Sequence, residues 1–158
     1  MASQTWNPHQ KSFPTLHELP EIEGAPKHAA WFWGKDDHLG RLNLLTPERV
    51  KAASAEIKTG ELARTDLPLN VPETPAFHRE KFQHEIKTLT PGLAYDDKYS
   101  LNTQSGTQWD GFRHAAHAQS KYFYNFAKGD DFVGPNASEK NSIHYWSKHG
   151  IAARGGKT

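Results

Sequence analysis

The sequence predicts a loop-rich globular chain that combines helix and strand. Three observations support this fold class. The chain has 158 residues, which is a usual size for a single domain. Twelve glycines and ten prolines, with only 35% hydrophobic residues, favour many turns. Five Trp, eight Phe and five Tyr supply large apolar surfaces, and the net charge of +1 causes no self-repulsion, so the composition does not predict disorder.

The charge balance and the absence of cysteine exclude several classes of protein. Nineteen basic and eighteen acidic residues leave no basic field for a nucleic-acid backbone, and we expect no nucleic-acid partner. With no cysteine, disulfides, thiolate metal sites and cysteine nucleophiles are excluded. The sequence shows neither a secretory signal pattern nor an apolar run of about eighteen residues, so we expect a cytoplasmic chain without a membrane partner.

Residues 1–30 are predicted to form an extended, proline-rich arm that precedes a domain over residues 31–158. Prolines at positions 8, 14, 20 and 26 prevent a long helix in this segment. We expect the arm to pack on its own domain or to contact another subunit.

The clearest predicted element is a helix between Thr46 and Gly60. Thr46 is a suitable N-cap, Pro47 fits the first helical position, and Gly60 supplies a stop. One narrow apolar stripe at helical spacing lies between them. Its residues are Val50, Ala53 and Ile57.

A strand near a sheet edge is predicted over residues 63–71. Leu67, Leu69 and Val71 alternate with other residues, and Pro68 favours an edge position because proline cannot donate a ladder hydrogen bond. Residues 77–89 give no clear pattern. Farther along, residues 96–101 are expected to form a turn that leads into a short strand, and a short helix is expected from Ser138 into Trp146.

The segment with the most chemical content runs from Gln104 to His114. Gln104, Gln108, Asp110 and His114 all carry oxygen or nitrogen donors. If 108–110 is extended, Gln108 and Asp110 point to the same face, because strand side chains alternate. Glycines within the segment permit tight turns that can bring His114 back toward the same cavity.

These donor types are suited to a divalent cation and a proton acceptor. A carboxylate such as that of Asp110 is a good ligand for a hard or borderline cation, and carboxamide oxygens coordinate weakly beside it. A bound cation acidifies water, and a neutral imidazole can accept the proton. The spacing alone also fits a turn with a satisfied polar network, so both interpretations stay open at this point.

Three blocks in a fixed order carry a family resemblance. They are residues 33–50, Leu67–Asn70 and Gln104–His114. The last block resembles the HxGTHxDxPxH signature of the cyclase family of metal-dependent hydrolases, which includes bacterial kynurenine formamidases and isatin hydrolases. Gly106, Thr107, Asp110 and His114 match this signature directly.

The resemblance implies an α/β fold with a mixed sheet or barrel-like core and flanking helices. Members of the family are longer, so residues 31–158 would form the N-terminal portion of such a domain and the fold would be incomplete. Arms like the one over residues 1–30 in relatives imply dimers or larger homo-oligomers.

By position, the resemblance implies that Asp110 binds the metal and that His114 transfers the proton. Gln108 and Gln104 stand where the family has two ligating histidines, and Phe112 stands where it has proline. Loss of two imidazoles favours one metal held mainly through oxygen, such as manganese, over tight zinc binding. The candidates for the substrate pocket are Trp109, His117 and Trp33.

The expected function is metal-dependent hydrolysis of an amide or formamide C–N bond in a small substrate. N-formylkynurenine, on the route from tryptophan to kynurenine, is the leading guess. The competing hypothesis is a truncated, non-catalytic fragment or pseudoenzyme that acts only through contacts with a partner, because the family's remaining ligands come from the second half of a longer chain.

Overall fold

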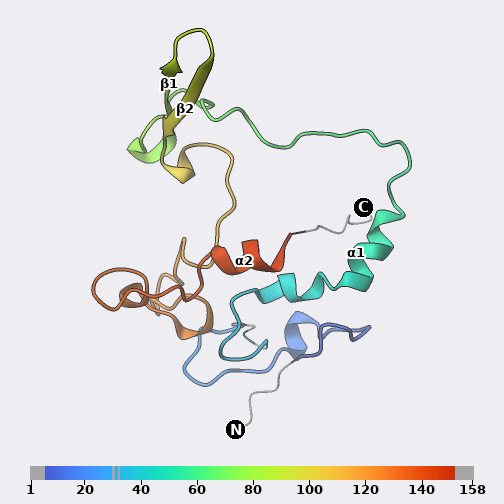
Figure 1. Cartoon of the computed structure of the whole chain (residues 1–158). Helices are drawn as coiled ribbons and strands as arrows, with labels where there is room; N and C mark the ends of the chain where they lie inside the picture. The colour runs from blue at the N-terminus through green and yellow to red at the C-terminus, as the bar shows by residue number, and fades with distance from the viewer. Residues whose placement is uncertain (1–5, 30, 32, 152–158) are drawn as a thin grey trace. The chain divides into compact units, whose positions relative to one another are not determined.

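A computed structural model describes residues 6–29, 31 and 33–151, and Figure 1 traces the whole chain. The chain divides into two compact units. Unit 1 comprises residues 1–60 and 110–158, and unit 2 comprises residues 61–109. The outer ends of the predicted arm and domain, residues 1–5 and 152–158, lie outside the described residues.

Regular elements in the described residues are short. Unit 1 contains the helices α1 (Pro47–Ser54) and α2 (His144–His149), and unit 2 contains the strands β1 (Gln83–Thr90) and β2 (Ala94–Ser100). The 3₁₀ helices are Leu16–Glu18, Gly40–Leu44, Tyr124–Phe126 and Gly129–Asp131 in unit 1, and Ala76–His78 and Thr103–Ser105 in unit 2.

The described part of the chain is therefore a small α/β structure whose sheet is a two-stranded antiparallel ribbon. It does not contain the mixed sheet or closed barrel-like core that the family resemblance implied. A barrel requires a sheet that closes on itself, and two strands are too few for that.

Helix α1 confirms the predicted start and corrects the predicted end. The Thr46 hydroxyl accepts a backbone N–H from the first turn at 3.4 Å, which is the N-cap interaction that the sequence predicted. The prediction that the helix continues to Gly60 is wrong, because α1 ends at Ser54. Ile57 is 73% exposed, so burial of the apolar stripe does not stabilise the additional turns.

The segment over residues 6–29 packs within unit 1 and touches α1. Arg49 donates to the backbone carbonyl of Pro8 at 2.6 Å and to that of Gln10 at 3.0 Å. Phe13 lies beside Trp33, with 6.3 Å between the ring centroids. Arg49 of α1 and the indole of Trp33 thus both contact this segment.

The strand predicted over residues 63–71 does not form. This segment has no ladder pairing, and Val71 closes a turn by donating to the carbonyl of Pro68 at 3.0 Å. Leu67 and Leu69 are 52% and 49% exposed. Alternating apolar residues make a strand only where a neighbouring strand and a buried face are present, and this segment has neither within the described residues.

The strands β1 and β2 form an antiparallel hairpin in the region that the sequence left ambiguous. Glu85 lies opposite Lys98. Lys87 lies opposite Asp96. Both cross-strand pairs join opposite charges and therefore favour this register. The prediction over residues 96–101 is confirmed for the strand but is wrong for the turn, because residues 96–100 all belong to β2.

The hairpin turn follows from Pro91 and Gly92. Leu93 donates to the carbonyl of Thr90 at 3.0 Å, which closes a four-residue turn. Proline suits the second position of such a turn, and Gly92 has a φ of 77°, a value that glycine adopts without steric cost. The chain therefore reverses direction between β1 and β2.

Helix α2 contains Trp146, as predicted, but begins at His144 and not at Ser138. Asn141 has a φ of 58°, and a residue in this left-handed conformation cannot continue a right-handed helix. Ser138 instead donates to the carbonyl of Asp131 at 3.0 Å in a loop.

The core of unit 1 combines aromatic rings with one buried amide. Trp33 is 8% exposed and Asn141 is 1% exposed. Phe112 stacks on Tyr124 at 4.2 Å and meets the edge of Trp146 at 5.4 Å. Residues far apart in the sequence therefore share one packed centre.

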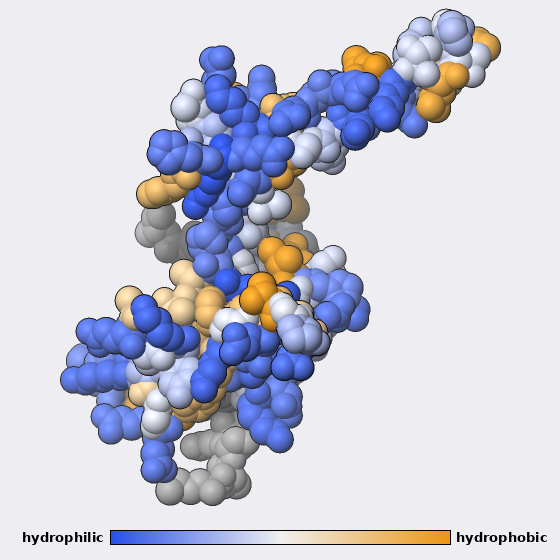
Figure 2. Space-filling view, turned by 90° about the vertical axis from the view of Figure 1, so that its left-hand side faces the viewer, coloured by the Kyte–Doolittle hydropathy of each residue, from blue (hydrophilic) through white to orange (hydrophobic). Residues whose placement is uncertain are grey.

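In the part of the chain that the structure describes, each helix is too short and too polar to traverse a bilayer. Hydrophilic residues cover most of the visible face, and hydrophobic residues are interspersed among them (Figure 2). Large exposed apolar residues include Leu62 at 96%, Leu93 at 84% and Phe77 at 83%.

Candidate functional site

The predicted motif begins in the 3₁₀ helix Thr103–Ser105 and continues as irregular backbone from unit 2 into unit 1. The division between them falls between Trp109 and Asp110. Residues 108–110 make no strand pairing, and residues 114–117 do not form a helix. Gln104 and Gln108 therefore belong to unit 2, and Asp110 and His114 belong to unit 1.

In unit 2, the two glutamines of the motif contact each other directly. Gln108 donates its carboxamide N–H to the side-chain oxygen of Gln104 at 3.1 Å. The backbone around Gln104 is also fixed, because Asn102 caps its N–H at 2.8 Å and Arg79 donates to its carbonyl at 3.0 Å. Gln104 is half-buried and Gln108 is exposed.

The second and third blocks of the family resemblance meet in unit 2. The hydroxyl of Thr107 accepts the backbone N–H of Leu67 at 3.0 Å. A Cβ on Gly106 would lie 3.0 Å from the carbonyl oxygen of Val71, so glycine allows these two segments to approach closely. The sequence spacing did not predict this contact.

In unit 1, Asp110 and His114 lie close together on an exposed turn. The Nε2 atom of His114 is 3.9 Å from the Oδ2 atom of Asp110, and the two side chains are 39% and 48% exposed. The turn is closed by the N–H of His114, which donates to the carbonyl of Gly111 at 3.1 Å. Gly111 packs against Ile143, where an added Cβ would lie 3.4 Å from the Ile143 Cβ.

The three residues predicted to line a substrate pocket have different environments. Trp33 is buried, whereas Trp109 is 57% exposed. The Nδ1 atom of His117 lies 3.0 Å from the hydroxyl of Ser120, in a local turn. Trp33 alone among the three contributes to the apolar cavity of unit 1 described next.

This cavity, which we call the aromatic cavity, has a volume of about 330 Å³. Its lining is mainly aromatic and aliphatic and includes one cationic side chain. Its lining residues include Phe13, Leu16, Trp33, Arg41, Phe112 and Tyr124. Gly40 also lines it and lets Phe112 approach, because a Cβ on Gly40 would lie 2.5 Å from the Phe112 ring.

A polar network that the sequence did not reveal supports the cavity wall. The Asp37 carboxylate accepts the hydroxyl of Tyr124 at 2.7 Å, the N–H of Gly40 at 2.7 Å, and the side-chain amide of Asn43 at 2.6 Å. Burial, together with the hydrogen bond to Asp37, raises the pKa of the Tyr124 hydroxyl well above its ordinary value. The Tyr124 hydroxyl thus stays protonated and bonded to Asp37.

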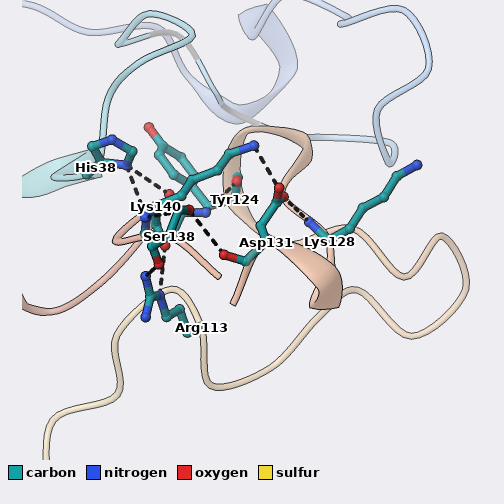
Figure 3. A network of polar contacts seen from close by, with 8 residues as sticks. His38, Arg113, Tyr124, Lys128, Asp131, Ser138 and Lys140 are labelled. Atoms are coloured by element: carbon teal, nitrogen blue, oxygen red, sulfur yellow. Dashed lines mark hydrogen bonds and ion pairs between the residues drawn. The ribbon is translucent and has the colours of Figure 1, made fainter. Parts of the chain in front are cut away.

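Asn141 links this network to the loop before α2. Its side-chain amide donates to the carbonyl of Tyr124 at 2.7 Å, and its backbone N–H donates to Nδ1 of His38 at 3.1 Å. Figure 3 shows Arg113 directed toward the same loop, where it donates to the carbonyls of Ser138 and Lys140. An asparagine within a polar turn gave no sequence signal for burial.

The described residues contain no group of three His, Cys, Asp or Glu side chains arranged to hold a metal. Asp110 and His114 of unit 1 are two side chains of these types that lie close together.

Comparison with known proteins finds similarity to solved structures. A search of protein families finds no match, and neither does a search of curated proteins. A crystal structure of a protein described as a novel cyclase is similar, with a TM-score of 0.57 and 25% sequence identity. The match covers 65% of this chain and 38% of that chain. The chain therefore has a cyclase-like fold in part, and it spans well under half the length of the cyclase that it matches.

Proposed function

We propose that this chain carries part of the active site of a metal-dependent hydrolase. The substrate would be a small aromatic compound with an amide or formamide C–N bond, and N-formylkynurenine is the first candidate. The observation that carries the proposal is the Asp110–His114 pair, 3.9 Å apart on an exposed turn. These two residues stand where the cyclase signature has a metal ligand and a proton-transfer histidine, and the similarity to a cyclase structure supports the same direction.

The donor chemistry fits one divalent cation at Asp110. Asp110 would hold the cation through its carboxylate, and the Nε2 atom of His114, 3.9 Å from Oδ2 of Asp110, would lie near enough to accept a proton from water at that site. Gln104 and Gln108 offer neutral oxygens, which suit manganese better than zinc.

The side chains of the chain itself would orient and move a proton. A bound cation would supply an acidified water in this site. Asp110 would hold the cation. His114 would accept the proton of the water through its Nε2 atom, which faces the Asp110 carboxylate. Both side chains are partly exposed, so a substrate can reach them.

We further propose that the mixed sheet or barrel-like core of the family is built together with residues that this sequence does not contain. The match to 38% of the cyclase chain supports this view. A homo-oligomer is proposed on the family resemblance alone, because arms like that over residues 1–30 occur in the oligomeric relatives. A cytoplasmic location remains the proposal that agrees with the absence of cysteine.

Metal binding tests the proposal most directly. Purified protein is titrated with Mn²⁺, and the bound ion is measured by electron paramagnetic resonance. Asp110→Asn keeps the shape of the side chain but removes its charge, and we expect it to weaken Mn²⁺ binding at least tenfold. Asp36→Asn is the matched control, because Asp36 is an exposed carboxylate of the same unit that pairs with Lys35. Equal binding by wild type and Asp110→Asn would refute the assignment.

A second candidate function is a non-catalytic fragment that acts through a partner. It is favoured by the large apolar side chains that the described residues leave exposed, such as Leu62 and Leu93. A formamidase assay with N-formylkynurenine separates the two candidates. Turnover by the manganese-loaded chain alone supports the hydrolase. Mn²⁺ binding without turnover, followed by turnover when the missing half of a cyclase is added, supports a partner-dependent fragment.

A further inference from the structure

The aromatic cavity of unit 1 is large enough for a small ligand. Its volume of about 330 Å³ lies at the lower end of the range of small-molecule sites, which suits a molecule with one or two rings. All of its lining residues belong to unit 1. The cavity does not include Asp110 or His114 in its lining, so it is distinct from the proposed metal site.

The walls favour a flat apolar group. Rings of Phe13, Trp33, Phe112 and Tyr124 line the cavity, and aromatic pairs pack in stacked or edge-to-face arrangements. The Tyr124 hydroxyl is already bonded to Asp37 at 2.7 Å. Tyr124 is therefore expected to offer its ring to a ligand, with its hydroxyl hydrogen already used.

One charged side chain lines the cavity, and that side chain is Arg41. Arg41 is exposed, and none of the described residues forms an ion pair or hydrogen bond with its guanidinium group. By contrast, Arg49 and Arg113 are each held by backbone carbonyls. A guanidinium group can pair with a carboxylate through two parallel hydrogen bonds.

We propose that the aromatic cavity binds a small aromatic carboxylate, with the ring between the aromatic walls and the carboxylate paired with Arg41. A carboxylate is preferred over a phosphate, because the lining offers a single cation and a phosphate group would draw on more donors. The site does not require a metal.

Binding is measured by isothermal titration calorimetry on the full chain, with a metal chelator present. The chelator separates this test from the metal-dependent function, since failure of one leaves the other unaffected. The probes are 2-naphthoate and its neutral counterpart 2-naphthylmethanol. We expect wild-type protein to bind 2-naphthoate about tenfold or more tightly than 2-naphthylmethanol, the difference typical of a charge-assisted hydrogen bond. This comparison needs no variant.

Variants then locate the site. Arg41→Gln is expected to weaken 2-naphthoate binding about tenfold and to leave 2-naphthylmethanol binding unchanged. Lys35→Gln removes the same charge from an exposed position of unit 1, and it should have little effect. Leu16→Trp places a larger side chain at the cavity lining, and it should weaken the binding of both probes.

Several results would overturn the proposal. Equal affinity for the two probes in wild type would show that no carboxylate is recognised. An equal loss of 2-naphthoate affinity in Lys35→Gln and Arg41→Gln would show that the positive charge of unit 1 attracts the carboxylate at long range, without a specific contact at Arg41. No binding of 2-naphthoate, together with a dimer that Leu16→Trp dissociates in sedimentation experiments, would show that a second copy of the chain covers the cavity.

Discussion

Replacing Asn141 with alanine should strongly destabilise unit 1. Asn141 is 1% exposed, and its side-chain amide donates to the carbonyl of Tyr124 at 2.7 Å. Alanine removes that donor, and the Tyr124 carbonyl keeps only the longer bond from the N–H of Ala127 at 3.3 Å. The same substitution leaves a void where the amide was.

The expected loss can be estimated from two contributions. A buried neutral hydrogen bond contributes about 1 kcal/mol, and leaving its acceptor poorly satisfied adds to that loss. Asn141 also has a φ of 58°, and alanine in this left-handed conformation costs about 1 kcal/mol more than asparagine, whose side chain tolerates it. Together the Asn141→Ala change should lower the free energy of unfolding by about 2–3 kcal/mol.

Urea unfolding followed by tryptophan fluorescence measures this loss, because four of the five tryptophans lie in unit 1. Asn136→Ala is the control, since Asn136 is an exposed residue of a nearby turn and its replacement should change the free energy of unfolding by less than about 0.5 kcal/mol. If Asn141→Ala and Asn136→Ala unfold at the same urea concentration as wild type, the buried amide does not stabilise unit 1 and the reasoning fails.

Three further predictions concern the same centre. The pKa of the Tyr124 hydroxyl is raised in the folded state. The protonated hydroxyl therefore contributes fully to stability below the ordinary pKa of 10.0, and this contribution is lost as the pH rises from 10.0 toward the raised pKa. Absorbance titration should therefore show one of the five tyrosines still protonated well above pH 10, and Tyr124→Phe should remove that late step; full titration of wild type in a single step near pH 10 would contradict this. Tyr124→Phe should also lower the free energy of unfolding by about 1.5–3 kcal/mol, because the hydrogen bond to Asp37 involves a charged acceptor. Gly40→Ala should destabilise more than Gly60→Ala in thermal unfolding, since both have positive φ but only the Cβ at position 40 would meet the Phe112 ring, at 2.5 Å, and equal melting temperatures would count against that steric argument.

Local chemistry was sufficient where neighbouring residues decide the conformation. The start of α1 follows from Thr46 and Pro47, because the cap and the fixed φ of proline act within one turn. A turn through Gly111 likewise brings His114 to within 3.9 Å of Asp110, and the metal site predicted there stays a prediction. Interactions over four residues need no knowledge of the rest of the chain.

Sequence patterns failed where a distant partner decides the conformation. The alternation over residues 63–71 predicted a strand, but the segment lacks a neighbouring strand and stays irregular. The strand β1 and its pairing with β2 were missed, because the stabilising pairs, such as Glu85 with Lys98, join residues that belong to different strands.

By itself, the sequence determined the first turn of α1, the donor types of the motif and the order of the three family-like blocks. Only the tertiary structure decided that Asn141 is buried, that Asp37 holds Tyr124, and that Arg41 lines an aromatic cavity without a partner among the described residues. The physical reason is that capping and turn formation depend on residues a few positions apart. Burial and cavity lining depend on segments that are distant in the sequence and that folding brings together. His38 and Asn141, for example, lie 103 positions apart and are in contact.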